Sequence, residues 1–285
     1  MATSRRPVQR RAAIRRAVEN DALDIVRRVL NRDVNLDALV ELYNGLDAPA
    51  RRPSIDPNLR IAFGFDANAL FRVGLAGTRG ADAVDFLRQQ HEGPLIVPGP
   101  VIQELWNNIL SGVEPQAKRL RKKFDELVGE MGAIDQRLGQ AGEDARTALE
   151  ALVDSHGDWI EPASQEIFEG TLQAVLNRAV TKYVPRREFY DIARVRKETK
   201  TPPGFRDGIA NFGDFFVWAD FLYSLAAADL TRVDAAVFVT NDVKDDWSRH
   251  GVAHPILVAE AFGVARVPFR LWTVQEFHAY VQAAG

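Results

Sequence analysis

Two short apolar segments constrain the fold of this chain more than any other feature. Residues 61–65 read IAFGF and residues 236–240 read AVFVT, so neither segment offers a charged face to water. Strands of this kind are typical of sheets that are buried on both faces. Segments with helical periodicity alternate with them along the chain, and this alternation predicts a parallel sheet covered by helices on both sides.

Further segments continue the same alternation. Residues 94–99 (PLIVPG) are expected to form a second strand, and Pro100 suits the first turn of the helix that follows. The remaining core elements are expected as a strand at 268–272 and as helices at 68–77, 100–110, 214–230, near 256–262, from 243 and from 273.

The chain divides into three parts by its pattern. Residues 1–56 are expected to form an N-terminal helical extension with a basic arm, which ends in a proline-rich loop. Residues 57–112 and 202–285 are expected to form the α/β core. Residues 113–201 are polar, charged and almost continuously helical in pattern, and they are too long for a loop between two strands. We therefore expect a helical insertion that projects from the core.

Composition excludes several classes of protein. The 285-residue chain contains no cysteine, which rules out disulfides, thiolate metal sites and a cysteine nucleophile, and which fits a reducing, cytoplasmic compartment. No apolar run is long enough to span a bilayer, so we expect no membrane partner. The arginine-rich start lacks the apolar region of a secretory signal. In composition it resembles an organellar transit peptide, and a basic helical arm is the favoured interpretation.

Basic residues are concentrated in a few segments, although the formal net charge is −3. The first sixteen residues contain six arginines and no acid, and residues 118–123 (KRLRKK) contain five bases. Residues 182–206 contain eight bases and three acids, with Phe189 and Tyr190 among them. A basic surface with exposed rings suits single-stranded nucleic acid, whereas a solvated helix face is the alternative. The residues expected to bind nucleic acid are Arg186, Arg187, Arg194, Arg196, Lys197 and Lys200.

Four acids occupy corresponding positions in the expected sheet. Asp66 and Asp242 follow apolar strands directly, Glu104 lies one turn into the helix after the second strand, and Asp214 begins the helix before the 236–240 strand. Because the carboxyl ends of parallel strands meet at one edge, the four are expected to lie together. Such a cluster is costly unless a cation neutralises it, and oxygen ligands favour Mg²⁺ or Mn²⁺. For each acid taken alone, a helix cap or a surface position is the alternative.

Short strings surround these acids: 66-DAN-68, 98-PGPVIQE-104, 213-GD-214 and 240-TND-242. In this order they resemble the four acidic motifs of the PIN domain family. The longer strings 202-PPGFRD-207, 213-GDFFVW-218 and 237-VFVTNDVKDDW-247 are similar to a larger bacterial PIN-like group whose members carry a long helical insert. The resemblance covers residues 57–112 and 202–285. It implies a three-layer α/β/α fold and a metal-dependent nuclease, in most members a ribonuclease.

The resemblance also implies roles for individual residues. Asp66, Glu104, Asp214 and Asp242 would bind the metal, and Asp246 would take the place of an additional acid. Asn68 and Thr240 would support these ligands by hydrogen bonding. Asp245 is expected to face solvent, on the assumption that 243–247 begins a helix, and Lys244 is left to pair with either neighbouring acid or to meet a phosphate.

The sequence weighs against several other activities. An aspartyl phosphatase would need a second acid where Asn68 stands, and no glycine-rich phosphate loop is present. Two alternatives remain open: a non-catalytic nucleic-acid-binding or partner-regulated module, and a DNA nuclease of the flap type with the same metal chemistry. The helical regions could bind a protein partner or a second copy of the chain. The favoured interpretation is a Mg²⁺- or Mn²⁺-dependent ribonuclease that hydrolyses single-stranded or loop RNA.

Overall fold

The structure is a computed structural model. It describes residues 5–47, 56, 58–74, 76, 78–109, 163–208, 211–241 and 244–284, together with residues 122, 126, 129, 130, 139, 140, 143, 144, 147 and 148. Much of the expected insertion, all of it within residues 113–162, and most of the proline-rich loop therefore lie outside the described residues. No helix in the described part of the chain is long and apolar enough to cross a membrane.

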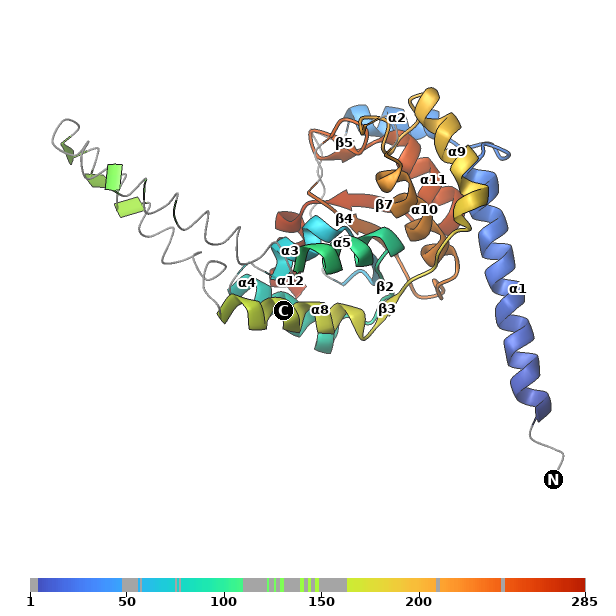
Figure 1. The fold of residues 1–285 in the computed structure, drawn as a ribbon, viewed down its shortest axis with the longest axis horizontal. Helices are drawn as coiled ribbons and strands as arrows, with labels where there is room; N and C mark the ends of the chain where they lie inside the picture. The colour runs from blue at the N-terminus through green and yellow to red at the C-terminus, as the bar shows by residue number, and fades with distance from the viewer. Residues whose placement is uncertain are drawn as a thin grey trace.

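A parallel sheet forms the centre of the molecule (Figure 1). Counted over the described residues, it has five strands in the order β3-β2-β1-β4-β7, and every neighbouring pair is parallel. The strands are β1 (Ile61–Phe65), β2 (Leu95–Ile96), β3 (Ala179–Val180), β4 (Ala235–Val239) and β7 (Phe269–Trp272). The predicted α/β class and the parallel sheet are confirmed.

The two central strands are buried on both faces, as their sequences predict. Every residue of β1 and β4 is buried. Phe63 and Val237 point into one hydrophobic core, whereas Ala62 and Phe238 point into the other. Gly64 allows a close approach on the second face, because a Cβ atom there would lie 2.4 Å from a ring carbon of Phe221.

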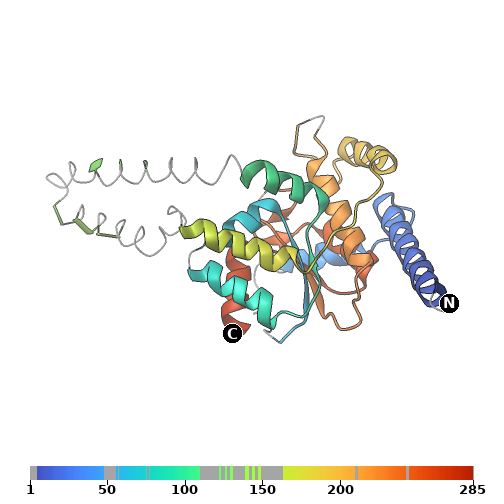
Figure 2. The same cartoon turned by 60° about the horizontal axis from the view of Figure 1, so that its bottom comes forward.

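Helices cover the first face of the sheet. Their apolar residues share one core with Phe63, and Figure 2 shows two of them, α4 and α8, side by side. This layer comprises α3 (Ala67–Gly74), α4 (Thr78–Asp85), the π-helical turn η2 (Phe86–Gln90), α5 (Gly99–Ile109), α8 (Ala163–Leu176) and α12 (Val274–Ala284).

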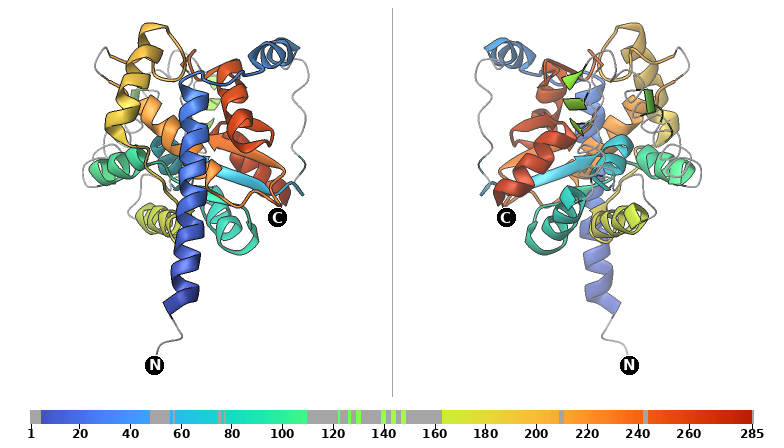
Figure 3. Two further views of the ribbon diagram at one scale, coloured as in Figure 1. Left: turned by 90° about the vertical axis from the view of Figure 1, so that its right-hand side faces the viewer. Right: turned by 90° about the vertical axis from the view of Figure 1, so that its left-hand side faces the viewer.

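A second set of helices covers the opposite face, which completes a three-layer α/β/α sandwich. These helices are α1 (Arg5–Leu30), α9 (Arg186–Glu198), α10 (Gly213–Ala226) and α11 (Pro255–Ala265), and α2 (Ala38–Asp47) contacts α11. Figure 3 shows that α1 runs along the body with one end and extends beyond it with the other. Among residues 17–30 of α1, whose burial the structure describes, the buried ones are Ala22, Val26, Val29 and Leu30.

The predicted insertion, 113–201, is too long at its C-terminal end. Strand β3 lies inside that range and pairs with β2, with Leu95 opposite Ala179. Helices α8 and α9, also inside it, contribute Val175 and Phe189 to the two cores. A two-residue strand is too short to leave a periodic pattern, which is why the sequence did not reveal it.

The helix predicted from residue 243 is also wrong. Residues 245–247 form a turn, and an antiparallel hairpin follows, made of β5 (Ser248–Arg249) and β6 (Val252–Ala253). His250 and Gly251 join the two strands with φ angles of 50° and 75°. Positive φ at both central positions is the requirement of a two-residue type I′ hairpin turn.

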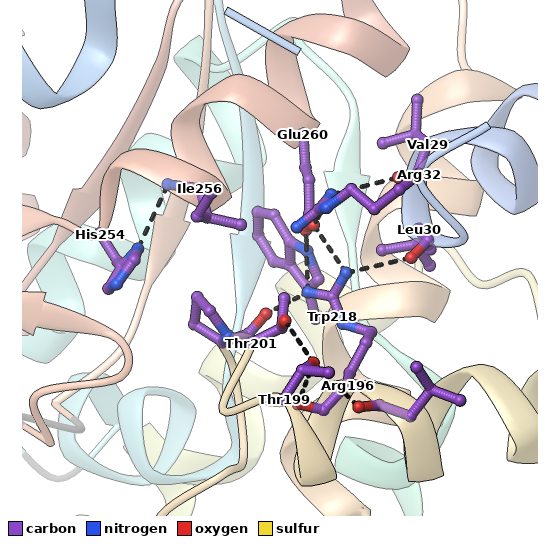
Figure 4. A network of polar contacts seen from close by, with 12 residues as sticks. Val29, Leu30, Arg32, Arg196, Thr199, Thr201, Trp218, His254, Ile256 and Glu260 are labelled. Atoms are coloured by element: carbon purple, nitrogen blue, oxygen red, sulfur yellow. Dashed lines mark hydrogen bonds and ion pairs between the residues drawn. The ribbon is translucent and has the colours of Figure 1, made fainter. Parts of the chain in front are cut away.

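A buried ion-pair network joins the helices of the second layer (Figure 4). The fully buried Glu260 of α11 accepts hydrogen bonds from Arg196 at 2.7 and 3.2 Å and from the indole of Trp218 at 2.7 Å. Arg32, just after α1, also pairs with Glu260, at 2.6 Å. Arg196 further donates to the carbonyl groups of Leu30 and Pro202. One carboxylate thereby connects α1, α9, α10 and α11.

Replacing Glu260 should destabilise the protein strongly. In Glu260→Gln the buried Arg196 guanidinium loses its counter-charge, and breaking a buried pair in this way costs about 3–5 kcal/mol. Urea denaturation followed by circular dichroism would measure the loss. The control is Glu198→Gln, which replaces an exposed carboxylate on α9. Its free energy of unfolding should stay within about 0.5 kcal/mol of that of the parent protein. Equal stability of the two variants would contradict the role given to this network.

Candidate active site at the carboxyl edge of the sheet

The candidate site lies where the strand order reverses, between β1 and β4. Chain connections run from β1 outward to β2 and β3 on one side, and β4 and β7 extend the sheet on the other. In α/β sheets of this kind, ligands bind beyond the carboxyl ends of the strands at such a switch point. The residues that directly follow β1 and β4 are Asp66 and Thr240.

Asp66 is held in place by β4. Its backbone N–H donates to the carbonyl of Val239 at 3.0 Å, which continues the parallel ladder by one residue. The hydroxyl of the buried Thr240 donates to the Asp66 carboxylate at 2.8 Å. Thr240 therefore sets the orientation of this carboxylate, which is the supporting contact expected from the sequence.

Glu104 faces Asp66 and Asp214 from α5. Glu104 is exposed at the surface, yet partial burial raises its pKa, and the negative charges of Asp66 and Asp214 raise it further. The three acids come from different parts of the chain, namely the residue after β1, helix α5 and the start of α10, and the charges of Asp66 and Asp214 reach Glu104. Three of the four predicted ligands are therefore electrostatic neighbours.

Asp214, the second residue of α10, binds side chains from the segment after β4. Its carboxylate accepts from Nζ of Lys244 and from Nε1 of Trp247, each at 3.1 Å. Burial raises the pKa of Asp214, with a further contribution from Asp207, and the bonds from Trp247 and Lys244 oppose the rise. The alternative in which Asp214 caps α10 is not supported, because Phe212 occupies the cap position and makes no side-chain cap bond.

Asp207 is an acid of this site to which the sequence reading gave no role. It accepts from Lys244 Nζ at 2.8 Å, so Lys244 bridges Asp207 and Asp214. Its second oxygen, Oδ2, is buried and has no hydrogen-bond partner among the described residues. Asp207 ends the string PPGFRD that contributed to the family resemblance, and that position was the available signal.

Asp246 is fully buried and holds the loop that carries Asp207. Its Oδ2 accepts from the backbone N–H groups of Gly204 at 2.9 Å and Arg206 at 3.2 Å. Its Oδ1 is buried and unpartnered within the described part of the chain. The neighbouring Asp245 is exposed and pairs with Arg206 at 3.3 Å. Asp245 thus faces solvent from a turn rather than from the helix that the sequence reading assumed.

The remaining predicted residues are placed less fully. Asp242 lies outside the described residues, and Asn68 is exposed on α3. Among the residues that the structure describes, no three acids or histidines are close enough to hold a metal ion. The donor set nevertheless suits a hard divalent cation, because it consists of oxygens and because Asp207, whose charge acts on Asp214, has a buried oxygen without a hydrogen-bond partner among the described residues.

Most of the basic residues expected to bind nucleic acid are engaged within the protein. The prediction for Arg196 is wrong, because its side chain is buried against Glu260. Arg186 forms a bidentate pair with the buried Asp220 at 2.9 and 2.6 Å, although part of its side chain is exposed. The others are Lys197, which donates to two backbone carbonyls, Arg194, which pairs with Asp191, and Arg187 and Lys200, which are exposed.

Comparison with known families agrees with this geometry. A family model described as a PIN like domain matches residues 62–257, which is more than half of the chain. The chain belongs to the PIN-like domain family. The match extends from β1 into α11, so it contains the candidate site and also the segment with β3. No curated protein and no solved structure matches the chain.

The acid cluster of this PIN-like domain should make its stability depend on pH. The folded-state pKa of Glu104 is raised above its ordinary value of 4.5. The destabilisation is therefore absent below that value and complete once the pH has passed the folded pKa. With chelator present, Glu104→Gln should match the parent protein in acid and become the more stable of the two as the pH approaches neutrality. Thermal unfolding at a series of pH values would measure this.

Two further measurements complete this test. Mn²⁺ should stabilise the parent protein more than Glu104→Gln, because the variant lacks one carboxylate of the cluster. Glu41→Gln, on α2, removes a carboxylate outside the cluster and is the matched control. A Glu104→Gln protein that is equally destabilised at every pH would show that Glu104 makes stabilising contacts instead of facing the other acids.

Proposed function

We propose that this PIN-like domain is a metal-dependent ribonuclease that hydrolyses phosphodiester bonds in single-stranded or loop RNA. PIN-like domains are generally nucleases, and this chain matches their family model across the candidate site. The observation that carries the proposal is the convergence of Asp66, Glu104 and Asp214 from three different elements at the switch point of the sheet.

Mg²⁺ or Mn²⁺ would be held by Asp66, Glu104, Asp214 and Asp242. When bound, the ion would supply positive charge that polarises the phosphodiester and makes water more acidic. Asp207 and Asp246 each have a buried carboxylate oxygen without a hydrogen-bond partner among the described residues, and the charge of Asp207 acts on Asp214. Asp246 acts mainly through the 204–206 backbone that it binds.

Neighbouring residues would orient the acids and exclude water. Thr240 holds the Asp66 carboxylate, and Trp247, which is buried and stacked on Phe238, holds that of Asp214. Lys244 places its ammonium group between Asp207 and Asp214. Its charge reduces the repulsion between these acids before a substrate arrives, and the same group can bind a phosphate oxygen of the RNA.

Replacing a single acid should remove cleavage without unfolding the protein. Asp66→Asn keeps an oxygen for the Thr240 hydroxyl, and Asp214→Asn keeps one for Trp247, yet each loses a charged ligand. We expect both variants, and Asp242→Asn, to be inactive on labelled single-stranded RNA with Mn²⁺. Asp246→Asn should cleave RNA more slowly, because Asp246 holds the backbone of residues 204–206. Asp245→Asn, the exposed control, should cleave RNA like the parent protein.

The substrate panel should include single-stranded and duplex RNA and DNA, each with Mn²⁺ and with chelator. Cleavage of DNA in preference to RNA would favour the flap-type alternative, and metal-dependent binding without cleavage would favour a non-catalytic module. An active Asp214→Asn protein with unchanged metal dependence would contradict the assignment of the site. Circular dichroism of each variant establishes that lost activity is not lost folding.

A further inference from the structure

Two tyrosines near the start of α9 are exposed: Tyr183, between β3 and α9, and Tyr190, in the second turn of α9. The side chain of Tyr183 is 56% exposed and that of Tyr190 is 48% exposed. Tyr183 follows β3, whose carboxyl end adjoins that of β2 at the same edge of the sheet as Asp66. Exposed aromatic rings are candidates for substrate contact, and Tyr183 packs against Gly99 at the start of α5, the helix that carries Glu104.

Tyr183 is held by a rigid support. The ring packs so closely on the backbone of Gly99 that a Cβ atom there would lie 2.2 Å from it. The guanidinium of Arg186 lies 5.8 Å from the Tyr183 ring centroid and 4.6 Å from that of Phe216. Cation–π contacts at these distances favour a fixed arrangement of the three side chains.

Asp220 fixes this support from below. The carboxylate is fully buried, binds both terminal nitrogens of Arg186, and also accepts from the N–H groups of Gly99 at 3.2 Å and Val184 at 2.9 Å. It thereby ties the first turn of α5, the segment with Tyr183 and the start of α9 to α10. The charge of Arg186 is compensated inside the protein, so Arg186 serves the rings more than it serves a phosphate.

Tyr190 has a similar support one helical turn away. Its ring meets that of Phe212 edge-on at 5.0 Å, and the ammonium group of Lys197 lies 5.2 Å from the Phe212 centroid. Phe212 and Phe216 are four residues apart at the start of α10, where the N–H of Phe216 bonds the carbonyl of Phe212, so they share one face of the helix.

The charges of this surface point to the kind of partner. Arg186, Arg194, Arg196 and Lys197 are already paired with acids or carbonyl groups. What remains for a ligand is the exposed pair Arg187 and Lys200, together with a row of aromatic rings backed by cations. Unpaired bases stack on such rings, whereas a duplex keeps its base faces covered.

We propose that Tyr183 and Tyr190, backed by Phe216 and Phe212, form a stacking surface for the bases of single-stranded RNA entering the acid site. The inference rests on the proposed nuclease function for its substrate class. Because stacking tolerates any base, this surface selects for an unpaired strand rather than for a sequence.

Binding of single-stranded RNA by tyrosine variants tests this proposal. Binding of a labelled single-stranded RNA is measured with chelator, and again with Mn²⁺ in an Asp214→Asn background, so that no strand is cut. Stacking contributes about 1–3 kcal/mol per base, so Tyr183→Ala should weaken binding by about 5- to 150-fold. Tyr183→Phe keeps the ring and should bind like the parent protein. Tyr43→Ala, which removes a tyrosine that is 74% exposed on α2, is the matched control.

An oligonucleotide series with one abasic position distinguishes a base contact from a structural effect. The parent protein should lose affinity when one particular base is missing, and Tyr183→Ala should be insensitive to that same base. Equal sensitivity in both proteins, or no binding of single-stranded RNA by the parent, would overturn the inference. Cleavage that survives Tyr183→Ala unchanged in KM would also overturn it and leave the nuclease proposal standing. Binding of single-stranded RNA that depends on the Tyr183 ring, without any cleavage, would support the stacking surface and contradict the nuclease proposal.

Discussion

The parallel pairing of β1 with β4 is the constraint on which the rest of the structure depends. The register places Phe65 beside Val239, so the chain leaves both strands at the same level. Asp66 then extends the ladder through its own N–H, and Thr240 reaches its carboxylate from the adjacent strand. Because β2 and β7 continue the sheet on opposite sides, the helices that follow β1 and β2 begin around this point. The acid cluster is a consequence of strand order.

Carboxylates below or close to the surface serve two distinct purposes in this molecule. Asp220 and Glu260 are fully buried and satisfied by arginines, which join helices that are distant in the sequence. Glu104 and Asp66 instead face other acids, and burial and like charge raise the pKa of Glu104. Burial alone therefore does not identify a functional acid. The charge of the neighbouring group distinguishes the two cases. A carboxylate paired with an arginine joins elements of the fold, whereas carboxylates that repel one another favour the binding of a cation.

The basic residues of α9 do not all face solvent, contrary to what their clustering in the sequence suggested. Its composition resembles a nucleic-acid-binding surface, yet Arg196 points inward to Glu260 and Arg186 to Asp220. Successive residues of a helix point about 100° apart, so a cluster of bases in the sequence is distributed around the axis. Which of them face solvent is decided by the helices that pack on α9. This side of the molecule therefore offers a ligand exposed rings together with only two of the six expected bases, Arg187 and Lys200.

The sequence by itself determined the α/β class, the two central strands, the acids Asp66, Glu104 and Asp214 at one sheet edge, and the family. These features are encoded in contiguous residues, because a doubly buried strand is an unbroken apolar run and a strand-end acid follows it directly. Only the tertiary structure decided the place of β3, the burial of Arg196 and the arrival of Asp207 at the site. These depend on contacts between residues far apart in the chain: 64 positions for Arg196 and Glu260, and 37 for Asp207 and Lys244. Such contacts leave no pattern in the local sequence, so they can be identified only from the folded structure.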